Sequence, residues 1–228
     1  MKIKKALFLL VTCTFLAVQA QTVKINNNFT IESDGTMVVD GQATTWDDIM
    51  VYPDATSKSG SNAPTWSTKF AGDGSSQGVY LWIFSKTTEQ EVYFTIQVPH
   101  SYKLGTTMKP HVHWTTFDKT PANDVVWGLE YTKMKFGGTF SSTSTILTSS
   151  TIIPTITPSG TKQHLITSLG DIVSGSSPND IGISTILICR LFRKAADVSD
   201  TFDDPVGFLG FDIHYEKDTD GSRSDFTK

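Results

Sequence analysis

The residues best suited to chemistry are two histidines, His111 and His113, separated by one valine in the stretch 109–116. Alternate side chains of a β-strand point to the same face, so these imidazoles would lie side by side. Neighbouring imidazoles are ligands that zinc and iron accept. Asp212 and His214 repeat the spacing further along the chain. The pattern predicts a zinc or iron ion held by His111, His113 and His214, within one subunit or around a threefold axis. The alternative is a polar face whose histidines hydrogen-bond to their neighbours.

Carboxylates predict a second chemistry for the same surface. Glu130, Asp212 and Glu216 lie in stretches with the same alternation, and a glycoside hydrolase needs two carboxyl groups about 5–9.5 Å apart. Arg190 offers a structural alternative, an ion pair with one of these acids. The ion pair is favoured, because two of the three tryptophans that would stack on sugar rings fall on the core side of their strands. Those three are Trp82, Trp114 and Trp127, and the predicted polar cluster is His111, His113, Glu130, Arg190, Asp212 and His214.

Three stretches must become neighbouring strands for these side chains to meet. They are 109–116, 124–136 and 208–216, and each alternates polar residues with aromatic or aliphatic ones. The run 79–84 is continuously apolar, as in a central strand covered on both faces. The strongest buried strand is 181–192, and only 162–173 favours a helical turn.

This arrangement of segments predicts the fold class. Roughly ten strands are joined by loops rich in Gly, Pro, Ser and Asn, and two sheets must each bury one face. The expected fold is all-β, a two-sheet antiparallel sandwich of the jelly-roll type.

The N-terminus has the layout of a secretory signal peptide. Three lysines within the first five residues precede an apolar run, and small residues stand at positions −3 and −1 before Gln21. We expect residues 1–20 to be removed, with cleavage between Ala20 and Gln21. The mature protein is then expected in the periplasm, on the cell surface or outside the cell. No later segment approaches the roughly 18 apolar residues of a transmembrane helix.

Charge and cysteine content narrow the class of protein further. Removal of residues 1–20 takes away three lysines and no acid, which changes the formal net charge from −4 to −7. Nucleic acids and anionic membranes attract clustered basic residues, so neither is an expected partner. Cys189 is the one cysteine left after cleavage, so the mature chain forms no intrachain disulfide. Its thiol is expected to be buried and inert.

Composition divides the rest of the chain into two parts. Residues 21–44 are short polar strands with a turn at Asp34 and Gly35. They form either a small hairpin that leans on the main domain or an arm that reaches a neighbouring subunit. Residues 45–228 form the sandwich domain, which is large enough for a core of its own.

A series of short motifs runs through residues 45–225. They are Thr45-Trp46-Asp47-Asp48, Pro99-His100-Ser101-Tyr102-Lys103, Pro110-His111-Val112-His113-Trp114, Trp127-Gly128-Leu129-Glu130-Tyr131, Cys189-Arg190-Leu191-Phe192-Arg193, Phe211-Asp212-Ile213-His214-Tyr215 and Gly221-Ser222-Arg223. In this order the motifs resemble a group of bacteriophage and prophage proteins that are taken to be virion-associated β-sandwiches. The resemblance implies a structural or appendage role and carries over no catalytic residues. The export signal departs from the phage pattern, because virion proteins assemble in the cytoplasm, and it indicates a bacterial gene whose product works at the cell surface.

These observations lead to two functional hypotheses. The first is a secreted, non-enzymatic structural or surface-appendage protein that self-associates, as a homo-oligomer or a surface assembly. The alternative is a secreted module that binds or hydrolyses glycans through the face of histidines and carboxylates.

Overall fold

The computed structural model describes residues 21–58, 60–72, 74–118, 124–149, 161–174 and 180–228. The predicted signal peptide, residues 1–20, lies outside these ranges. Regular structure in the described residues is almost entirely β. The strands are β1 (Val23–Asn26), β2 (Phe29–Ile31), β3 (Met37–Val39), β4 (Thr45–Val51), β5 (Ser57–Lys58), β6 (Thr65–Phe70), β7 (Val79–Phe84), β8 (Gln90–Gln97), β9 (Lys109–Thr115), β10 (Trp127–Met134), β11 (Thr145–Ser149), β12 (Leu165–Ser168), β13 (Ile186–Arg193) and β14 (Val206–Lys217). Three short 3-10 turns are η1 (Gly41–Ala43), η2 (Pro53–Ala55) and η3 (Gly60–Asn62).

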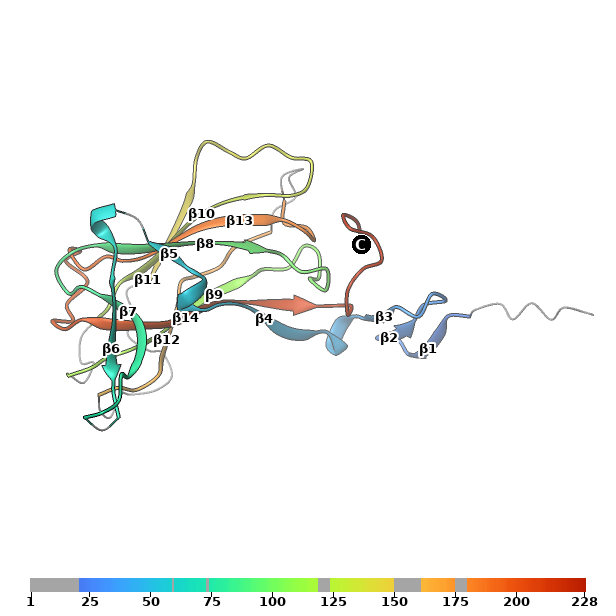
Figure 1. The fold of residues 1–228 in the computed structure, drawn as a ribbon. Helices are drawn as coiled ribbons and strands as arrows, with labels where there is room; N and C mark the ends of the chain where they lie inside the picture. The colour runs from blue at the N-terminus through green and yellow to red at the C-terminus, as the bar shows by residue number, and fades with distance from the viewer. Residues whose placement is uncertain (1–20, 59, 73, 119–123, 150–160, 175–179) are drawn as a thin grey trace, which may run out of the picture.

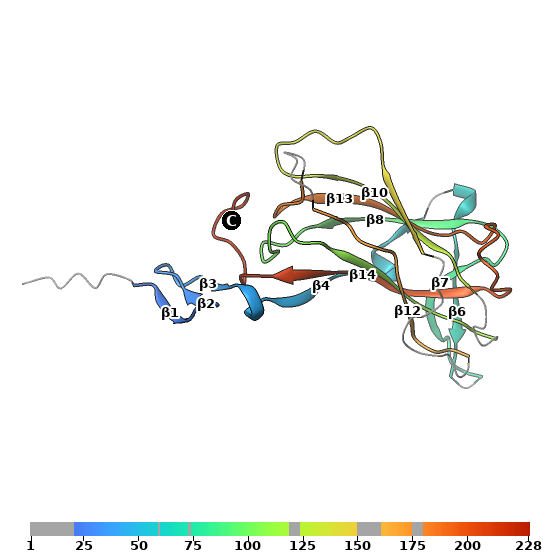
Figure 2. The same ribbon diagram turned by 180° about the vertical axis from the view of Figure 1, so that it is seen from behind.

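The strands from β7 to β14 form a jelly roll. β7 pairs with β14, β8 with β13, β9 with β12 and β10 with β11, so the first strand lies beside the last and the series closes inward. β14 also pairs with β9, and β13 with β10. One sheet therefore has the order β11-β10-β13-β8 and the other β12-β9-β14-β7, and the two layers face each other in Figures 1 and 2. The predicted antiparallel sandwich of jelly-roll type is confirmed.

Three further strands extend these sheets. β5 pairs with β8 and completes a five-stranded sheet, while β6 pairs with β7 in a six-stranded sheet. The long strand β14 pairs with β7 through Val206–Phe208 and with β4 through Phe211–Lys217. Because β9 occupies the other side of β14, β4 and β7 follow one another along a single side of it.

The core lies between the two sheets and is rich in aromatic rings. Trp114 of the six-stranded sheet and Trp127 of the five-stranded sheet have no exposed surface. Phe84 joins the layers, with its ring centroid 5.1 Å from that of Trp127 in an edge-to-face contact. Full burial of one such side chain contributes about 1.5–3 kcal/mol. Cys189 is buried in this core, which raises the pKa of its thiol to about 12.

Two sequence-based predictions of local structure are corrected. The stretch 162–173 was expected to hold a helical turn, yet it contains β12, because Leu165 and Thr167 are buried while Ile166 and Ser168 are exposed. That period of two is the signature of a strand. The run 79–84 is β7, and it is covered on both faces only in part: Leu81 and Trp82, which point to opposite faces, are buried, whereas Val79 and Tyr80 at its start are exposed.

The N-terminal strands β1, β2 and β3 form a separate three-stranded sheet beyond one end of the sandwich (Figure 1). We call it the arm sheet. Val38 bridges to Thr219, and the Val39 backbone N–H donates to the Asp218 carbonyl at 2.7 Å. These contacts attach the arm sheet to the segment that follows β14.

No helix in the described part of the chain is long and apolar enough to cross a membrane.

Candidate functional site

Four adjacent strands gather the predicted histidines on one surface. β4, β14, β9 and β12 lie side by side in that order, and their alternate side chains turn away from the core. We call this surface the outer face. Its residues are Trp46, Asp48 and Met50 of β4, Asp212 and His214 of β14, Lys109, His111 and His113 of β9, His164 just before β12, and Ile166 and Ser168 of β12.

Asp212 is the centre of the outer face. Its Oδ1 lies 3.2 Å from His111 Nδ1, and its Oδ2 lies 2.6 Å from His113 Nε2. His113 Nδ1 in turn lies 2.7 Å from His164 Nε2. An ionised carboxylate can only accept hydrogen bonds, so the two ring nitrogens that face Asp212 carry the protons. A neutral His113 must then accept at Nδ1 from His164, and the contacts determine the tautomers of all three rings.

These contacts change the acidity of the groups. Burial raises the pKa of the Asp212 carboxyl, but the hydrogen bonds and positive charge of His111 and His113 outweigh it and lower that pKa to about 2. Loss of hydration, followed by repulsion from His113, lowers the pKa of His164 below 6.5. Asp212 therefore stays ionised at neutral pH, while His164 favours its uncharged form.

A second group of contacts lies beside the first. His214 Nδ1 lies 2.6 Å from Asp48 Oδ1, and the His214 ring stacks on Trp46 with centroids 4.9 Å apart. Lys109 Nζ lies 4.8 Å from the centroid of the Trp46 ring. The rings of His111 and His214 are 6.3 Å apart, so the two groups form one continuous cluster.

Some atoms of the cluster stay open to a ligand. Among the described residues, Nε2 of His111 and Nε2 of His214 have no hydrogen-bond partner in the protein. The Trp46 side chain is 43% exposed, and Met50 and Ile166 are exposed too. The outer face thus combines hydrogen-bond acceptors, an ammonium donor and apolar surface.

Glu130 and Arg190 of the predicted cluster lie elsewhere. They pair across β10 and β13 in the five-stranded sheet, with Arg190 Nε 2.9 Å from Glu130 Oε2. Arg190 Nη1 also donates to Glu89 at 3.1 Å. The structural ion pair expected for Arg190 is present, but its partners do not join the histidines, because β10 and β13 belong to the opposite layer.

The three carboxylates that the sequence offered for catalysis, Glu130, Asp212 and Glu216, are not placed as a glycosidase pair. Glu130 and Asp212 lie in different sheets. Asp212 and Glu216 share a face of β14, but four residues of strand separate them by about 13 Å. That distance exceeds the separation that either glycosidase mechanism requires.

Metal coordination was the other predicted chemistry. Within the described ranges, no group of three or more His, Cys, Asp or Glu side chains is arranged to hold a metal ion. The Nδ1 atoms of His111 and His214 are engaged by carboxylates. The zinc or iron ion expected at His111, His113 and His214 stays a prediction.

The tryptophans expected to meet sugar rings are mostly internal. Trp114 and Trp127 are fully buried, and Trp82 is 8% exposed. The exposed indoles belong instead to Trp46 and Trp66. Alternation along β4 would have placed Trp46 beside Asp48 on a polar face.

His164 and Asp48 complete the cluster and were missed by sequence reasoning. Reading 162–173 as a helical turn hid the fact that His164, Ile166 and Ser168 share one face of a strand. Alternation along β4 places Asp48 on a polar face but does not reveal its partner, because His214 is 166 residues away in the chain.

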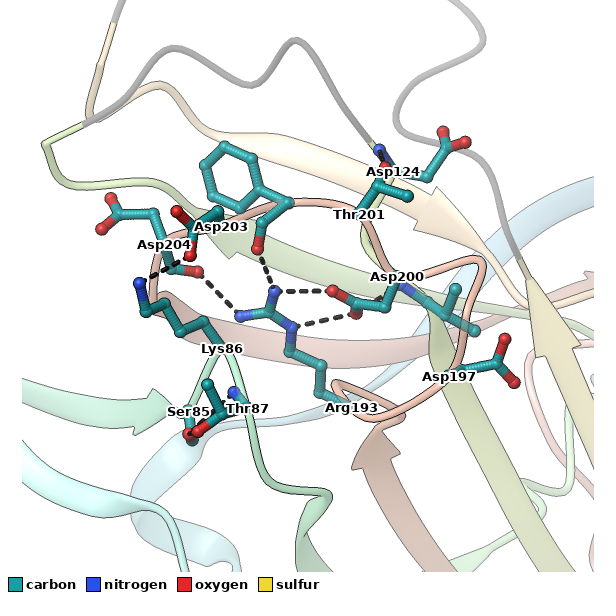
Figure 3. A network of polar contacts seen from close by, with 12 residues as sticks. Ser85, Lys86, Thr87, Asp124, Arg193, Asp197, Asp200, Thr201, Asp203 and Asp204 are labelled. Atoms are coloured by element: carbon teal, nitrogen blue, oxygen red, sulfur yellow. Dashed lines mark hydrogen bonds and ion pairs between the residues drawn. The ribbon is translucent and has the colours of Figure 1, made fainter.

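A second polar network lies in the interior, around Arg193 (Figure 3). Its guanidinium binds the Asp200 carboxylate through two hydrogen bonds of 2.8 and 3.0 Å. It also donates to the backbone carbonyls of Phe202 and Asp204. Both side chains of the ion pair have zero exposure. The network holds the connection between β13 and β14 in place and offers nothing to a ligand.

Comparison with known proteins finds similar solved structures. No protein-family model matches the chain, and neither does any curated protein. One solved structure is TmCBM61 in complex with β-1,4-galactotriose, with 14% identity and a TM-score of 0.28 over 76% of this chain and 88% of that one. Another is the enzymatically active domain of tailspike protein 4 of bacteriophage CBA120, with 11% identity and a TM-score of 0.26 over 75% of this chain and 19% of that one. At TM-scores this low, neither similarity bears on function.

Proposed function

We propose that this protein is an exported, non-enzymatic glycan-binding β-sandwich, and that the outer face is its binding surface. The observation that carries the proposal is the cluster formed by Asp212 with His111 and His113, and by Trp46 with His214, on one open sheet. Sugars present hydroxyl groups at their edges and C–H groups on their ring faces. Carboxylates and imidazoles bond to the hydroxyls, and aromatic or apolar side chains pack on the ring faces.

The extent of the outer face favours an oligosaccharide over a single sugar ring. Four neighbouring strands contribute to it, and strands lie about 4.8 Å apart, so it is roughly 14 Å wide. Met50 on β4 and Ile166 on β12 mark its two sides with exposed apolar side chains. A chain of sugars lying across the strands would meet both of them and the histidines between.

The state of Asp212 supports binding over catalysis. A glycosidase needs a proton donor, and Asp212, with a pKa of about 2, is ionised at neutral pH. Its two oxygens already accept hydrogen bonds from His111 and His113. We therefore assign Asp212, which is only 6% exposed, the role of orienting the imidazoles, and His111 Nε2 the role of bonding to sugar hydroxyls.

A glycan array probed with the mature chain, followed by calorimetry on the best ligand, tests the proposal. Asp212→Ala and Trp46→Ala should each weaken binding at least tenfold. Glu130→Gln, a carboxylate change on the opposite sheet, is the matched control and should bind like the wild type. Treatment with EDTA should leave the affinity unchanged. Absence of binding to any glycan, or equal losses in Glu130→Gln and Asp212→Ala, would refute the proposal.

Self-association is the second candidate, and the arm sheet favours it. β1 is an edge strand whose four residues are all exposed, including Ile25 at 64%. An unpaired apolar edge can add a strand from another copy, which fits the appendage role that the resemblance to phage proteins implies. Light scattering should give a mass above that of a monomer for the mature chain, and Ile25→Lys should restore the monomer. A monomeric wild type at all concentrations would contradict it.

A further inference from the structure

A cleft of about 360 Å³ lies beside β6 and β7. None of its lining residues belongs to the outer face. One wall is formed by Trp66 and Trp82, and the other by Asp54, Thr56 and Lys58. Its volume lies at the small end of the range for small-molecule sites.

The aromatic wall is rigid and exposed. Trp66 and Trp82 are direct cross-strand partners, with ring centroids 4.8 Å apart in an edge-to-face contact. The ring of Tyr80, two residues from Trp82 on β7, has its centroid 6.4 Å from that of Trp66. Trp66 is nonetheless 41% exposed and Tyr80 is 49% exposed. Two neighbours hold the Trp66 indole in one orientation while much of its surface faces solvent, which is the preorganised state that a stacking ligand requires.

The polar wall is held in place by Trp82. Trp82 Nε1 donates to the Pro53 carbonyl at 2.8 Å and to Thr56 Oγ1 at 2.9 Å. Thr56 Oγ1 also donates to the Pro53 carbonyl at 2.6 Å. These bonds anchor η2 and β5, the elements that carry Asp54 and Lys58.

The two charged groups of the polar wall are available to a ligand. Within the described residues, neither Asp54 nor Lys58 forms an ion pair with another side chain. Lys58 Nζ lies over the Trp82 ring at 6.0 Å. The cleft therefore offers one carboxylate acceptor, one ammonium donor and an apolar wall.

We propose that this cleft is a second binding site, which takes a single sugar ring with Trp66 as its stacking surface. A sugar hydroxyl both donates and accepts, so it satisfies Asp54 and Lys58 together. An organic cation would be repelled by Lys58, and an anion by Asp54. The choice of a sugar rests in part on the proposed function, because both sites are assigned the same class of ligand, but the cleft shares no residue with the outer face.

Two sites on one chain would let a long glycan be held at two points. Joining two weak contacts in this way raises avidity by about 10²–10⁴ when the ligand can reach both. The outer face would bind the body of an oligosaccharide, and the cleft a terminal or branching ring.

Saturation-transfer NMR on the mature chain tests the cleft. The probes are the methyl glycosides of glucose, galactose and N-acetylglucosamine. We expect at least one of them to show transfer to the C–H protons of one ring face. Trp66→Ala should abolish the transfer, Trp66→Phe should retain part of it, and Asp54→Asn should weaken binding about tenfold, as expected for the loss of one hydrogen bond to a charged group. Glu130→Gln, on the opposite sheet and outside both sites, is the matched control and should leave the transfer unchanged.

The outcomes separate this inference from the proposed function. Transfer that persists in Trp66→Ala and disappears in Asp212→Ala would place the sugar on the outer face and overturn the second site alone. No transfer with any of the three glycosides would overturn it as well, and so would binding of tetramethylammonium in place of sugar. Trp66→Ala also removes ring contacts with Trp82 and Tyr80 and should lower the unfolding temperature. Trp66→Phe keeps an aromatic ring at this position and provides the second, better-folded variant.

Discussion

The networks around Arg193 and Asp212 use similar groups in opposite surroundings. Arg193 is enclosed, and its guanidinium is fully engaged by the Asp200 carboxylate and two backbone carbonyls. Asp212 is itself only 6% exposed, but it belongs to the outer face, where Nε2 of His111 and Nε2 of His214 have no partner among the described residues. The difference teaches that burial, more than residue type, separates a polar network that holds the fold from one that is open to a ligand.

The physical reason for this difference is the free-energy cost of removing a charge from water. A buried charge loses its water shell, and only a complete set of partners compensates for the loss. Arg193 has such a set, so removal of one partner leaves a charge stranded in the interior. The histidines of the outer face are partly hydrated, and a ligand can replace their water at modest cost.

The largest effect is expected from breaking the buried network. Asp200→Asn should lower the free energy of unfolding by about 3–5 kcal/mol, because it leaves Arg193 charged and unpaired. Urea denaturation measures the loss. Arg193→Lys should also destabilise the protein strongly, since an ammonium cannot form the two parallel bonds to Asp200. If Asp200→Asn were as stable as the wild type, the buried network around Arg193 would not be holding the fold, and the contrast with the outer face would fail.

A smaller loss of stability is expected when Asp212 becomes asparagine. The folded-state pKa of Asp212 lies below its ordinary value of 3.8, so its contribution to stability is present above pH 4 and is lost as the pH falls through 2. The shift corresponds to about 2 kcal/mol. Asp212→Asn should lose that amount at pH 7 and should bind glycan at least tenfold more weakly.

Chemical denaturation at several pH values checks the assignment. The wild type should lose stability between pH 4 and pH 2 more steeply than Asp212→Asn does. Identical slopes would show that Asp212 is not the group responsible.

The ion pair on the opposite sheet should matter less. Arg190 is partly exposed and bonds to Glu130 and Glu89, and pairs of this kind contribute about 0–1 kcal/mol. Arg190→Gln should therefore shift the urea midpoint only slightly and leave glycan affinity unchanged. A loss as large as that of Asp200→Asn would contradict the ranking by burial.

The smallest effect on stability is expected from a change at His164, and only at acidic pH. Loss of hydration and the charge of His113 lower its pKa in the folded protein. Folding therefore opposes its protonation, and stability should fall as the pH drops below 6.5. His164→Gln should remove that part of the decline. Thermal unfolding at pH 7.5 and pH 5.5 measures it, and an unchanged difference between the two midpoints would refute it.

The sequence by itself determined the fold class and one half of the site. Alternation of polar and apolar residues placed His111 with His113 and Asp212 with His214, and it sent Trp114 to the core. These properties are local, because successive side chains in a strand alternate between its two faces, so the position of a residue in the strand determines the face it occupies. The chemistry of the outer face was therefore readable from two short stretches.

Only the tertiary structure decided which strands share a sheet. The alternation of side chains along a strand does not show to which layer of a sandwich the strand belongs. The predicted cluster therefore combined Glu130 and Arg190, of the five-stranded sheet, with histidines of the six-stranded sheet. The partners that complete the outer face come from distant segments, with Asp48 and His214 separated by 166 residues. Such pairings depend on how the whole chain packs, and no local pattern encodes them.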